Sequence, residues 1–486
     1  MKEEDLRSTV DSTIFRRSGV VEAGQLKRNA LGVPQVMFFV VAMVGPLAQA
    51  IGCSPFVFGY IGTGTAGAYV LGGIVMALFA MGYVAMARKI TSAGGFSSFI
   101  ALAFGERLGT ASAYVALITY NAIIINAYGS IGAFGSVILK TLFNIDVPWQ
   151  ALSICMLLIA AITGYREINL SVKILGILAV CEIAIFLILD FVITFHGGAN
   201  WFSMAAFSPS NIFAGNFWMG LLWSVGCFGG IEATVVYSEE ARNPKKTIPR
   251  ATYLVVVLII VFYTFTTWAI TNAIGDNLKE VVLKNPTGFI FDIAAHYLGN
   301  IGNGIINGFM FTSIIASIIG THNVISRYIY SLSRANALHL TIARTHPRFK
   351  SPHIASIIQS VVSAVVILAC IILDADPFVQ MMGWFGSVGI LGTFVLFMST
   401  SLSVLVLFRK LGVEKEGVGK TILAPVFSFA IILIITVMAI MNFSSISGTT
   451  GYMSYLWLLL PIAGGAGFIS TYLKPRGSLN LSADFN

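Results

Sequence analysis

The chain has 486 residues, of which 57% are hydrophobic and only 10% are charged. A soluble globular domain carries about 25% charged residues, so this composition excludes a mainly soluble protein and indicates a polytopic membrane protein. The formal net charge of +8 is compatible with nucleic-acid binding by itself, but the positions of the basic residues along the chain favour a membrane topology instead.

Twelve apolar segments follow a polar N-terminal stretch. Residues 1–33 contain no apolar core of a signal peptide, so we expect them to form a cytoplasmic N-terminal tail. A helix that crosses the membrane needs roughly 20 apolar residues, and the chain is therefore predicted to be all-α with 12 transmembrane helices. These segments, numbered spans 1 to 12, lie at about 34–60, 66–88, 97–139, 147–164, 168–195, 212–238, 248–274, 304–334, 355–373, 377–408, 421–442 and 452–473. Residues 474–486 are expected to be a cytoplasmic C-terminal tail.

Two stretches do not fit a simple crossing. Span 3, at 97–139, is too long for one passage through the membrane, so its start, "FSSFIALAFGERLG", is predicted to be a short cytoplasmic surface helix. Residues 275–303, before span 8, form a long amphipathic insertion on the outer side.

Lysine and arginine lie almost entirely on one side of this topology. All of the 29 basic residues except Lys140, Lys279 and Lys284 fall on the two tails, on the connections that share their side, or in the ends of the spans that adjoin those connections. Cytoplasmic loops are enriched in Lys and Arg, so both termini are predicted to be cytoplasmic in a plasma or inner membrane. The expected surroundings are therefore a lipid bilayer, with no nucleic-acid partner.

Spans 1 and 6 each contain residues that interrupt a helix. Span 1 contains "AMVGPLAQAIGCSPF", in which Pro46 removes a backbone donor and clashes with the preceding turn, while Gly45 and Gly52 loosen its flanks. Span 6 contains three glycines in "SVGCFGGIEA". Irregular backbone at membrane depth is tolerated only where protein or a water-filled cavity surrounds it. Two breaks that lie five spans apart predict an inverted repeat, spans 1–5 against spans 6–10, with a substrate site between the breaks.

The breaks also suggest how a ligand would be held. N-termini of half-helices suit a carboxylate, and unwound carbonyl groups suit an ammonium group or a cation. Phe228 abuts the span 6 break, and Tyr120 and Asn121 are polar groups in an apolar run that should face protein or a cavity. The alternative is that Gly and Pro merely kink the two helices. The candidate substrate-binding residues are Gly45, Pro46, Leu47, Ala48, Gln49, Ala50, Gly52, Tyr120, Asn121, Gly226, Phe228, Gly229, Gly230 and Ile231.

Several stretches resemble the amino acid–polyamine–organocation (APC) superfamily of permeases. The most specific is "FGGIEATVVYSEEARNPKKTIPRA" in spans 6 and 7, and "KRNALGVPQVMFFVVAMVGPL", "SAGGFSSFIALAFG" and "SRYIYSLSRANALHLTIARTHPRFKSPHIA" are similar to the same family. The resemblance covers the whole chain. It implies the five-plus-five inverted-repeat (LeuT-like) fold of amino-acid and neurotransmitter transporters over residues 34–410, followed by two accessory C-terminal spans over residues 411–473.

The sequence departs from the family pattern in three places. Many amino-acid members carry a G-x-G-x-G type of break in span 1, where this chain has "VGPLAQAIG". This departure leaves the substrate open, because in the family span 1 supplies the carboxylate contacts. "RANALHL" stands where "RDG-x-x-P" is usual, and Phe96 stands where a tyrosine is usual. Both of these lie in predicted cytoplasmic segments and bear little on the fold.

Carboxyl groups within the spans are the candidates for ion coupling. An ionisable residue near the bilayer centre costs on the order of 3 kcal/mol on insertion scales, and Glu182 lies 14 residues into span 5. Proton-coupled relatives often carry a Lys in this stretch in place of a sodium ion, so the resemblance implies that Glu182 carries a proton. A Glu182 that only holds the bundle together is the alternative. Glu232, directly after the span 6 break, either accepts bonds from freed backbone N–H groups or meets a substrate amine or a proton.

Other polar groups allow further interpretations. Ser313, Ser317 and Thr321 form one stripe on span 8, which could help to coordinate sodium or could bond back to its own helix. Asp190 is expected to meet water near the outer end of span 5. The charged residues from Glu239 to Arg250 are expected to close a gate or to order the loop after span 6.

The sequence contains no visible catalytic set, nucleotide-binding loop, cofactor motif or metal-ligand spacing, so we expect neither an enzyme nor a cofactor. The predicted function is secondary transport of an amino acid or related amine by alternating access, with a proton favoured over sodium as the coupling ion. A polyamine or organic-cation carrier and an amino-acid exchanger are alternatives within transport. A transport-inactive ligand-binding membrane receptor is the alternative from a different class.

Overall fold

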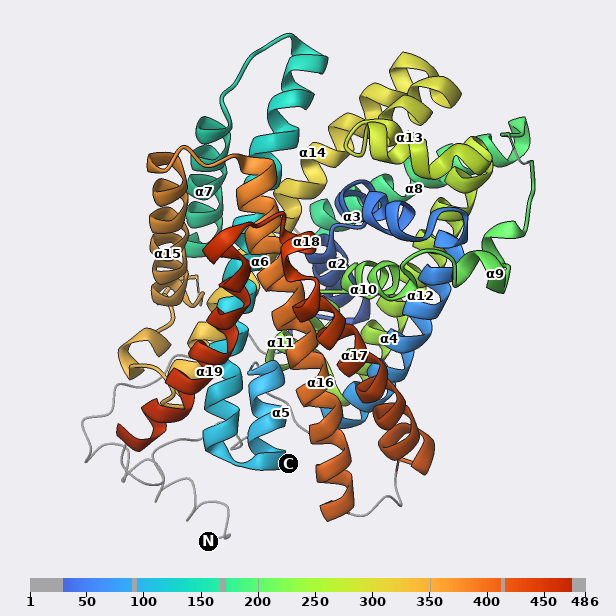
Figure 1. Ribbon diagram of the computed structural model, residues 1–486. Helices are drawn as coiled ribbons and strands as arrows, with labels where there is room; N and C mark the ends of the chain where they lie inside the picture. The colour runs from blue at the N-terminus through green and yellow to red at the C-terminus, as the bar shows by residue number, and fades with distance from the viewer. Residues whose placement is uncertain are drawn as a thin grey trace, which may run out of the picture.

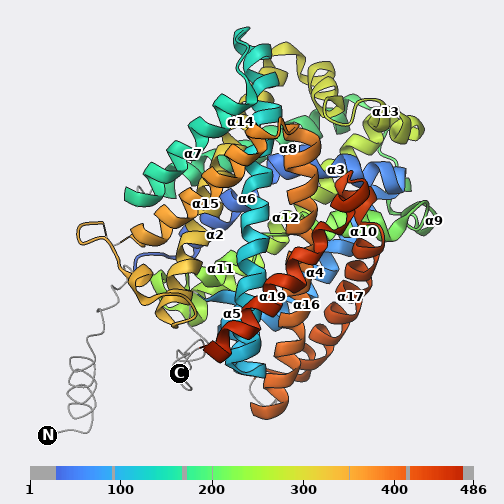
Figure 2. The ribbon, with the colours of Figure 1, turned by 60° about the vertical axis from the view of Figure 1, so that its left-hand side comes forward.

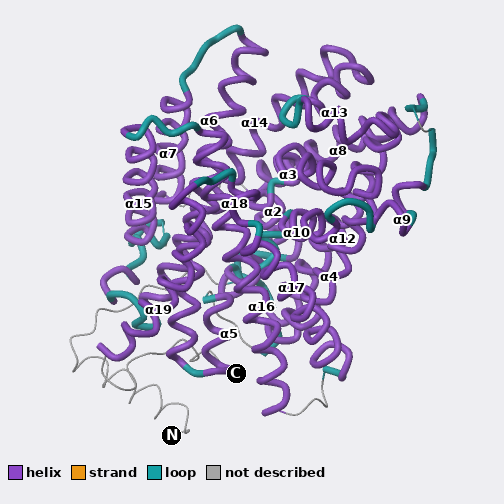
Figure 3. Tube along the Cα trace, viewed as in Figure 1, coloured by secondary structure: helices purple, strands orange, loops and turns teal. Residues whose placement is uncertain are grey.

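The computed structural model describes residues 29–89, 94–166, 172–199, 201–349, 351–411 and 416–473. Within these ranges the chain is helical and contains no strand (Figure 3). The predicted C-terminal tail and most of the predicted N-terminal tail lie outside the described residues.

The helices follow the predicted segments closely. In the first half they are α2 (Val33–Val44), α3 (Pro46–Ile61), α4 (Thr65–Ala87), α5 (Gly95–Phe104), α6 (Glu106–Phe143), α7 (Trp149–Arg166), α8 (Val172–His196), α9 (Pro209–Ile212), α10 (Phe217–Gly226) and α11 (Ala233–Val236). In the second half they are α12 (Pro244–Ile274), α13 (Leu278–Lys284), α14 (Phe289–Arg334), α15 (His353–Ile372), a π-helical turn (Pro377–Phe385), α16 (Gly386–Leu411), a second π-helical turn (Gly419–Leu423), α17 (Ala424–Met441), α18 (Phe443–Ser447) and α19 (Leu459–Ser470).

Ten stretches of the described residues are long and apolar enough to cross a membrane. One of them runs from Val33 to Ala87 and contains both predicted spans 1 and 2, separated by a turn at Gly62 with a φ of 75°. Predicted span 6 is absent from the ten because its regular helix stops at Gly226. The ten stretches therefore differ from the twelve predicted spans in two places: spans 1 and 2 are counted as one stretch, and span 6 is too short to be counted.

The outer helices place apolar side chains outward and polar side chains inward. On α15, exposed apolar residues recur every three or four positions at Ile357, Val361, Val365, Leu368 and Ile372. Gln359 and Ser363, on the opposite face of the same helix, are fully buried. Polar groups that face the bundle interior are typical of a membrane protein, so the exposed face of α15 is suited to lipid.

The interrupted helices lie in the middle of the bundle. In Figures 1 and 2, α2, α10 and α11 are surrounded by longer helices, among them α6 and α14. Helix α2 packs against α8, α12 and α14, and α10 packs against α3 and α4. The arrangement thus brings segments that are about 190 residues apart in the sequence into the same core.

The segments before spans 3 and 8 are both helical, but the first is more deeply buried than predicted. A separate helix before span 3 is confirmed as α5, which Gly105 (φ 95°) separates from α6, but α5 is not on the surface. Phe96 and Phe99 are fully buried because α5 packs against both α6 and α16. The insertion before span 8 is helical, as its amphipathic pattern indicates, and α14 includes part of it up to a kink at Gly299.

Candidate functional site

The break in span 1 is a single residue. Helix α2 ends at Val44, Gly45 adopts a left-handed conformation (φ 60°, ψ 67°), and α3 begins at Pro46. Pro46 has no N–H group and its φ suits the first position of a helix, so the chain resumes a helix at once. The interruption predicted at Gly45 and Pro46 is present, but Gly52, predicted to loosen the flank, lies inside a regular helix. Leu47, Ala48, Gln49, Ala50 and Gly52 all lie within α3.

Helix α14 packs directly on this break. The Ser317 hydroxyl donates a hydrogen bond of 3.0 Å to the carbonyl oxygen of Met43, in the last turn of α2. A Cβ atom on Gly45 would lie 3.5 Å from the Ser313 Oγ. The predicted polar stripe therefore faces the span 1 break, and Ser317 bonds to α2 instead of its own helix.

The break in span 6 is longer. Helix α10 ends at Gly226, α11 begins at Ala233, and the residues between them form successive turns. Gly230 adopts a φ of 107°, which side chains disfavour, and a Cβ atom there would come within 3.1 Å of Val44 Cγ2. The two breaks are therefore in direct contact, at Gly230 of one and Val44 of the other.

Glu232 holds the span 6 break from within. Its Oε2 accepts a hydrogen bond of 2.9 Å from the Gly230 N–H, and its Oε1 accepts one of 3.4 Å from the Tyr120 hydroxyl. The Tyr83 hydroxyl donates to the carbonyl oxygen of Glu232 at 2.7 Å. These contacts agree with the interpretation that Glu232 accepts a bond from backbone that the break frees.

The other predicted site residues have different surroundings. Phe228 is fully buried, and its ring is perpendicular to that of Tyr263 on α12, with 6.4 Å between the ring centroids. Ile231 is also fully buried. Asn121 points toward α15, where its Oδ1 accepts a 3.0 Å hydrogen bond from Gln359 Nε2. Tyr120 thus reaches the span 6 break, whereas Asn121 makes its contact with another helix.

Glu182 lies at the junction of spans 1, 5 and 8. It is buried on α8, and the side chain of Ser313 lies next to its carboxyl group. The Ser313 hydroxyl has no hydrogen-bond partner of standard geometry within the described residues, and the same holds for Thr321. Since Ser313 also faces Gly45, the predicted proton carrier is one side chain away from the span 1 break.

Sequence reasoning misjudged or missed two polar groups. The expectation that Asp190 meets water is wrong, because its side chain is fully buried and its Oδ2 accepts a 2.7 Å hydrogen bond from Thr266 on α12. His322 on α14 is buried and bonded to Ser356 at 2.9 Å. Ser356 and Ser360 are polar residues at four-residue spacing in span 9. This spacing indicates a polar face on span 9 and is the sequence signal for the contact between Ser356 and His322.

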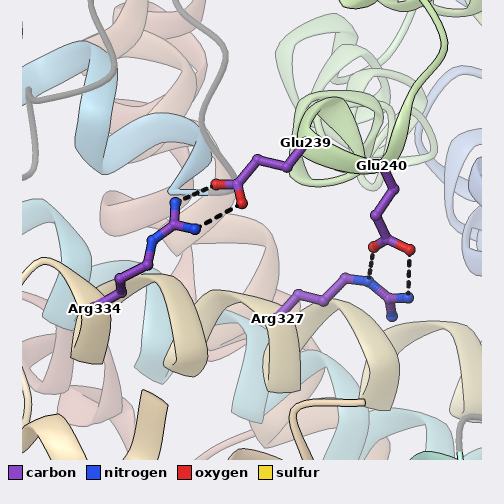
Figure 4. A network of polar contacts seen from close by, with 4 residues as sticks. All are labelled: Glu239, Glu240, Arg327 and Arg334. Atoms are coloured by element: carbon purple, nitrogen blue, oxygen red, sulfur yellow. Dashed lines mark hydrogen bonds and ion pairs between the residues drawn. The ribbon is translucent and has the colours of Figure 1, made fainter. Parts of the chain in front are cut away.

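Two ion pairs join the end of the span 6 segment to α14 (Figure 4). Arg327 Nε lies 2.6 Å from Glu240 Oε1, and both side chains are only 6% exposed. Arg334 Nη2 lies 2.5 Å from Glu239 Oε1 in a more exposed position. The backbone oxygen of Glu240 also accepts hydrogen bonds from the N–H groups of Ala30 and Leu31. Glu240 therefore connects three segments of the chain.

The fold and the site define a multi-pass membrane protein in which two interrupted helices meet inside an apolar bundle. The chain belongs to the amino acid permease family, whose family model matches residues 41–478. The resemblance to the amino acid–polyamine–organocation permeases is thereby confirmed.

Three relatives illustrate the family. The aromatic amino acid transport protein AroP of Corynebacterium glutamicum is 27% identical over 59% of this chain and 62% of its own length. The serine/threonine exchanger SteT of Bacillus subtilis is 23% identical over 62% and 67%, respectively. The branched-chain amino acid permease BcaP of Lactococcus lactis is 22% identical over 73% and 76%. The chain thus matches less than two thirds of the length of AroP.

A solved structure shares the overall fold. The manganese transporter of Eremococcus coleocola superposes with a TM-score of 0.58 over 93% of this chain and 96% of its own. The two sequences are only 11% identical. The likeness therefore concerns the fold alone.

Proposed function

We propose that this protein is a secondary transporter that moves an amino acid or a related amine by alternating access. The observation that carries the proposal is the contact between the two helix breaks at Gly230 and Val44. Helix breaks that meet inside a bundle supply free backbone groups to a ligand at membrane depth. The names of the relatives, which are amino acid permeases and an exchanger, support this substrate class.

The proposal includes twelve crossings with both termini in the cytoplasm. The stretch from Val33 to Ala87 has 55 residues, or about 80 Å of helix at 1.5 Å per residue, against a hydrocarbon core of about 30 Å. It is therefore counted as two spans, and α10 with α11 as another. Spans 1–5 and 6–10 form the proposed inverted repeat within 34–410, and 411–473 supply the two accessory spans.

The substrate is proposed to bind between α3 and the span 6 break. The N-terminus of α3 follows Gly45 and offers N–H groups to a carboxylate, while the carbonyl groups of 227–232 suit the amine. A Cβ atom on Gly52 would meet nothing within 4 Å, and one on Gly226 would meet its nearest atoms, those of the Ile390 side chain, at 3.7 Å, an ordinary van der Waals distance. This open space supports the admission of a small ligand.

Coupling is proposed to act through Glu182. The side chain of Ser313 lies between Glu182 and the span 1 break. A change of charge on Glu182 therefore changes the electrostatic potential where the substrate carboxylate is proposed to bind. Sodium coupling is the second candidate, because the buried hydroxyl groups of Ser313 and Thr321 have no hydrogen-bond partner of standard geometry within the described residues.

The two ion pairs of Glu239 and Glu240 are proposed to close the cytoplasmic side. They tie the end of the span 6 segment to α14, and the buried Glu240 pair is reinforced by the ring of Tyr237, whose centroid lies 5.0 Å from the Arg327 guanidinium carbon. Access from the cytoplasm then requires both pairs to separate.

The decisive experiment is uptake by proteoliposomes that contain the purified protein. Labelled amino acids and labelled polyamines are offered with a pH gradient, with a sodium gradient, and with unlabelled substrate inside but no gradient. Accumulation of an amino acid under the pH gradient supports the proposal. Uptake of polyamines alone contradicts the proposal and favours a polyamine or organic-cation carrier. Ligand binding with no uptake under any condition contradicts it and favours a receptor.

A further inference from the structure

A basic hollow lies at the C-terminal end of α4 and the N-terminal end of α12. It has a volume of about 570 Å³. Its charged lining consists of Arg88, Lys89, Lys245, Lys246, Arg250 and Glu416. Five cations therefore share one hollow with a single carboxylate.

That carboxylate is already engaged. Glu416 Oε2 lies 3.1 Å from Arg88 Nη1. Lys89, Lys245, Lys246 and Arg250 have no acidic partner among the residues that the structure describes. Four like charges in a concave surface repel one another and attract an anion. The enrichment of Lys and Arg on the cytoplasmic side does not require these side chains to cluster in one hollow, since Lys and Arg at span ends can extend separately into water.

The start of α12 strengthens the preference for an anion. Its first turn contains Lys245 and Lys246 and no acidic residue. A helix N-terminus carries a partial positive charge that favours acidic side chains, so these lysines add to an unfavourable field. A bound anion offsets this repulsion.

The apolar surface next to the hollow indicates the source of the anion. Arg250 shares one face of α12 with Leu254, Val257 and Val261, which are about half or more exposed. Arg88 shares one face of α4 with Ile74 and Met81, which are also exposed. Helices α4 and α12 pack side by side (Figure 2). An apolar surface with the spacing of a lipid-facing stripe therefore runs from each helix into the hollow.

We propose that the hollow binds the phosphate-bearing headgroup of an anionic phospholipid, whose acyl chains lie along the exposed stripes of α4 and α12. Basic pockets between membrane helices are suited to such headgroups. The lipid bridges α4 and α12 to the segment at Glu416, which precedes α17. This proposal concerns a lipid site and does not depend on which substrate the protein carries.

The test titrates the purified full-length protein, in neutral detergent, with phosphatidylglycerol or phosphatidylcholine and counts bound lipid by native mass spectrometry. The variant Lys245→Gln/Lys246→Gln/Arg250→Gln removes three cations from the hollow. The matched control Lys140→Gln/Lys279→Gln/Lys284→Gln removes three cations from the opposite side of the proposed topology. Each basic residue near an anionic surface contributes about 1 kcal/mol, or roughly fivefold in affinity.

We expect the wild type and the control to retain phosphatidylglycerol over phosphatidylcholine, and the first variant to lose affinity for it by about 100-fold. Arg250→Gln alone should lower the affinity for phosphatidylglycerol about fivefold. This single variant provides a readout if the triple variant is unstable. Equal retention by the triple variant, or an equal loss in the control, overturns the proposal. Inorganic phosphate or glycerophosphate that binds as tightly as the lipid overturns the assignment to a bilayer lipid.

Discussion

The buried pair of Arg327 and Glu240 gives the sharpest test of the gate. Both side chains are only 6% exposed, and removal of one partner of such a pair costs about 3–5 kcal/mol because the other charge stays buried. Glu240→Gln should therefore lower the population of the closed cytoplasmic side by roughly 100-fold or more relative to the open one. Glu239→Gln is the matched control. Its pair with Arg334 is partly exposed, so its effect should correspond to about 1 kcal/mol or less.

Ser238 offers a reporter for this change. It is buried beside the two glutamates, and its hydroxyl has no hydrogen-bond partner within the described residues, so Ser238→Cys is a mild substitution. In a background without the five native cysteines, labelling by a membrane-impermeant maleimide is measured in inside-out vesicles. Labelling should be slow in the parent, fast with Glu240→Gln and nearly unchanged with Glu239→Gln.

The double variant Glu240→Gln/Arg327→Gln tests whether the effect of Glu240→Gln comes from the unpaired Arg327. It leaves no buried charge at this position, so labelling should fall back toward the parent rate. Labelling that does not rise with Glu240→Gln, or that rises equally with Glu239→Gln, refutes the assignment of the buried pair to the gate.

Three further predictions concern coupling, the helix break and the topology. Glu182→Gln should abolish accumulation driven by a pH gradient and preserve exchange of internal for external substrate, because exchange requires no group that changes charge; normal accumulation would show that Glu182 is structural. Gly230→Ala should lower the free energy of unfolding by about 1–3 kcal/mol, since it combines a φ of 107° with a 3.1 Å contact to Val44; an unchanged melting temperature would contradict this. Lys279→Cys should be labelled only from outside and Lys245→Cys only from inside, and the reverse pattern would invert the topology.

The helix breaks could be predicted from local chemistry, but their extent could not. Pro46 and Gly45 indicate an interruption because one lacks a donor and the other tolerates a left-handed conformation. Gly52 carries no such requirement, and α3 continues through it. In span 6 the clustered glycines indicate an interruption, and they lie where α10 stops at Gly226 and before α11 begins at Ala233, but they do not reveal how far it extends.

Burial within the bundle depended on partners that are distant in the sequence. The position of Asp190 in α8 does not reveal Thr266, which lies 76 residues later and covers its carboxylate. The buried state of α5 depends on α16, almost 300 residues further along the chain. Likewise, Asn121 and Tyr120 are adjacent in sequence, yet one contacts α15 and the other reaches the span 6 break.

The attachment of Ala30 and Leu31 to Glu240 has a practical consequence for handling the protein. These contacts join backbone to backbone, and Arg242 N–H returns a 2.7 Å hydrogen bond to the Leu31 oxygen. Side-chain substitutions at 30 and 31 therefore leave the tether in place, whereas a pull on the chain ahead of residue 30 is transmitted directly to Glu240. A bulky fusion partner or a surface anchor at the N-terminus would therefore apply force to the ion pair between Glu240 and Arg327 of α14. Kinetic and single-molecule measurements are best made with tags and attachment points at the C-terminus.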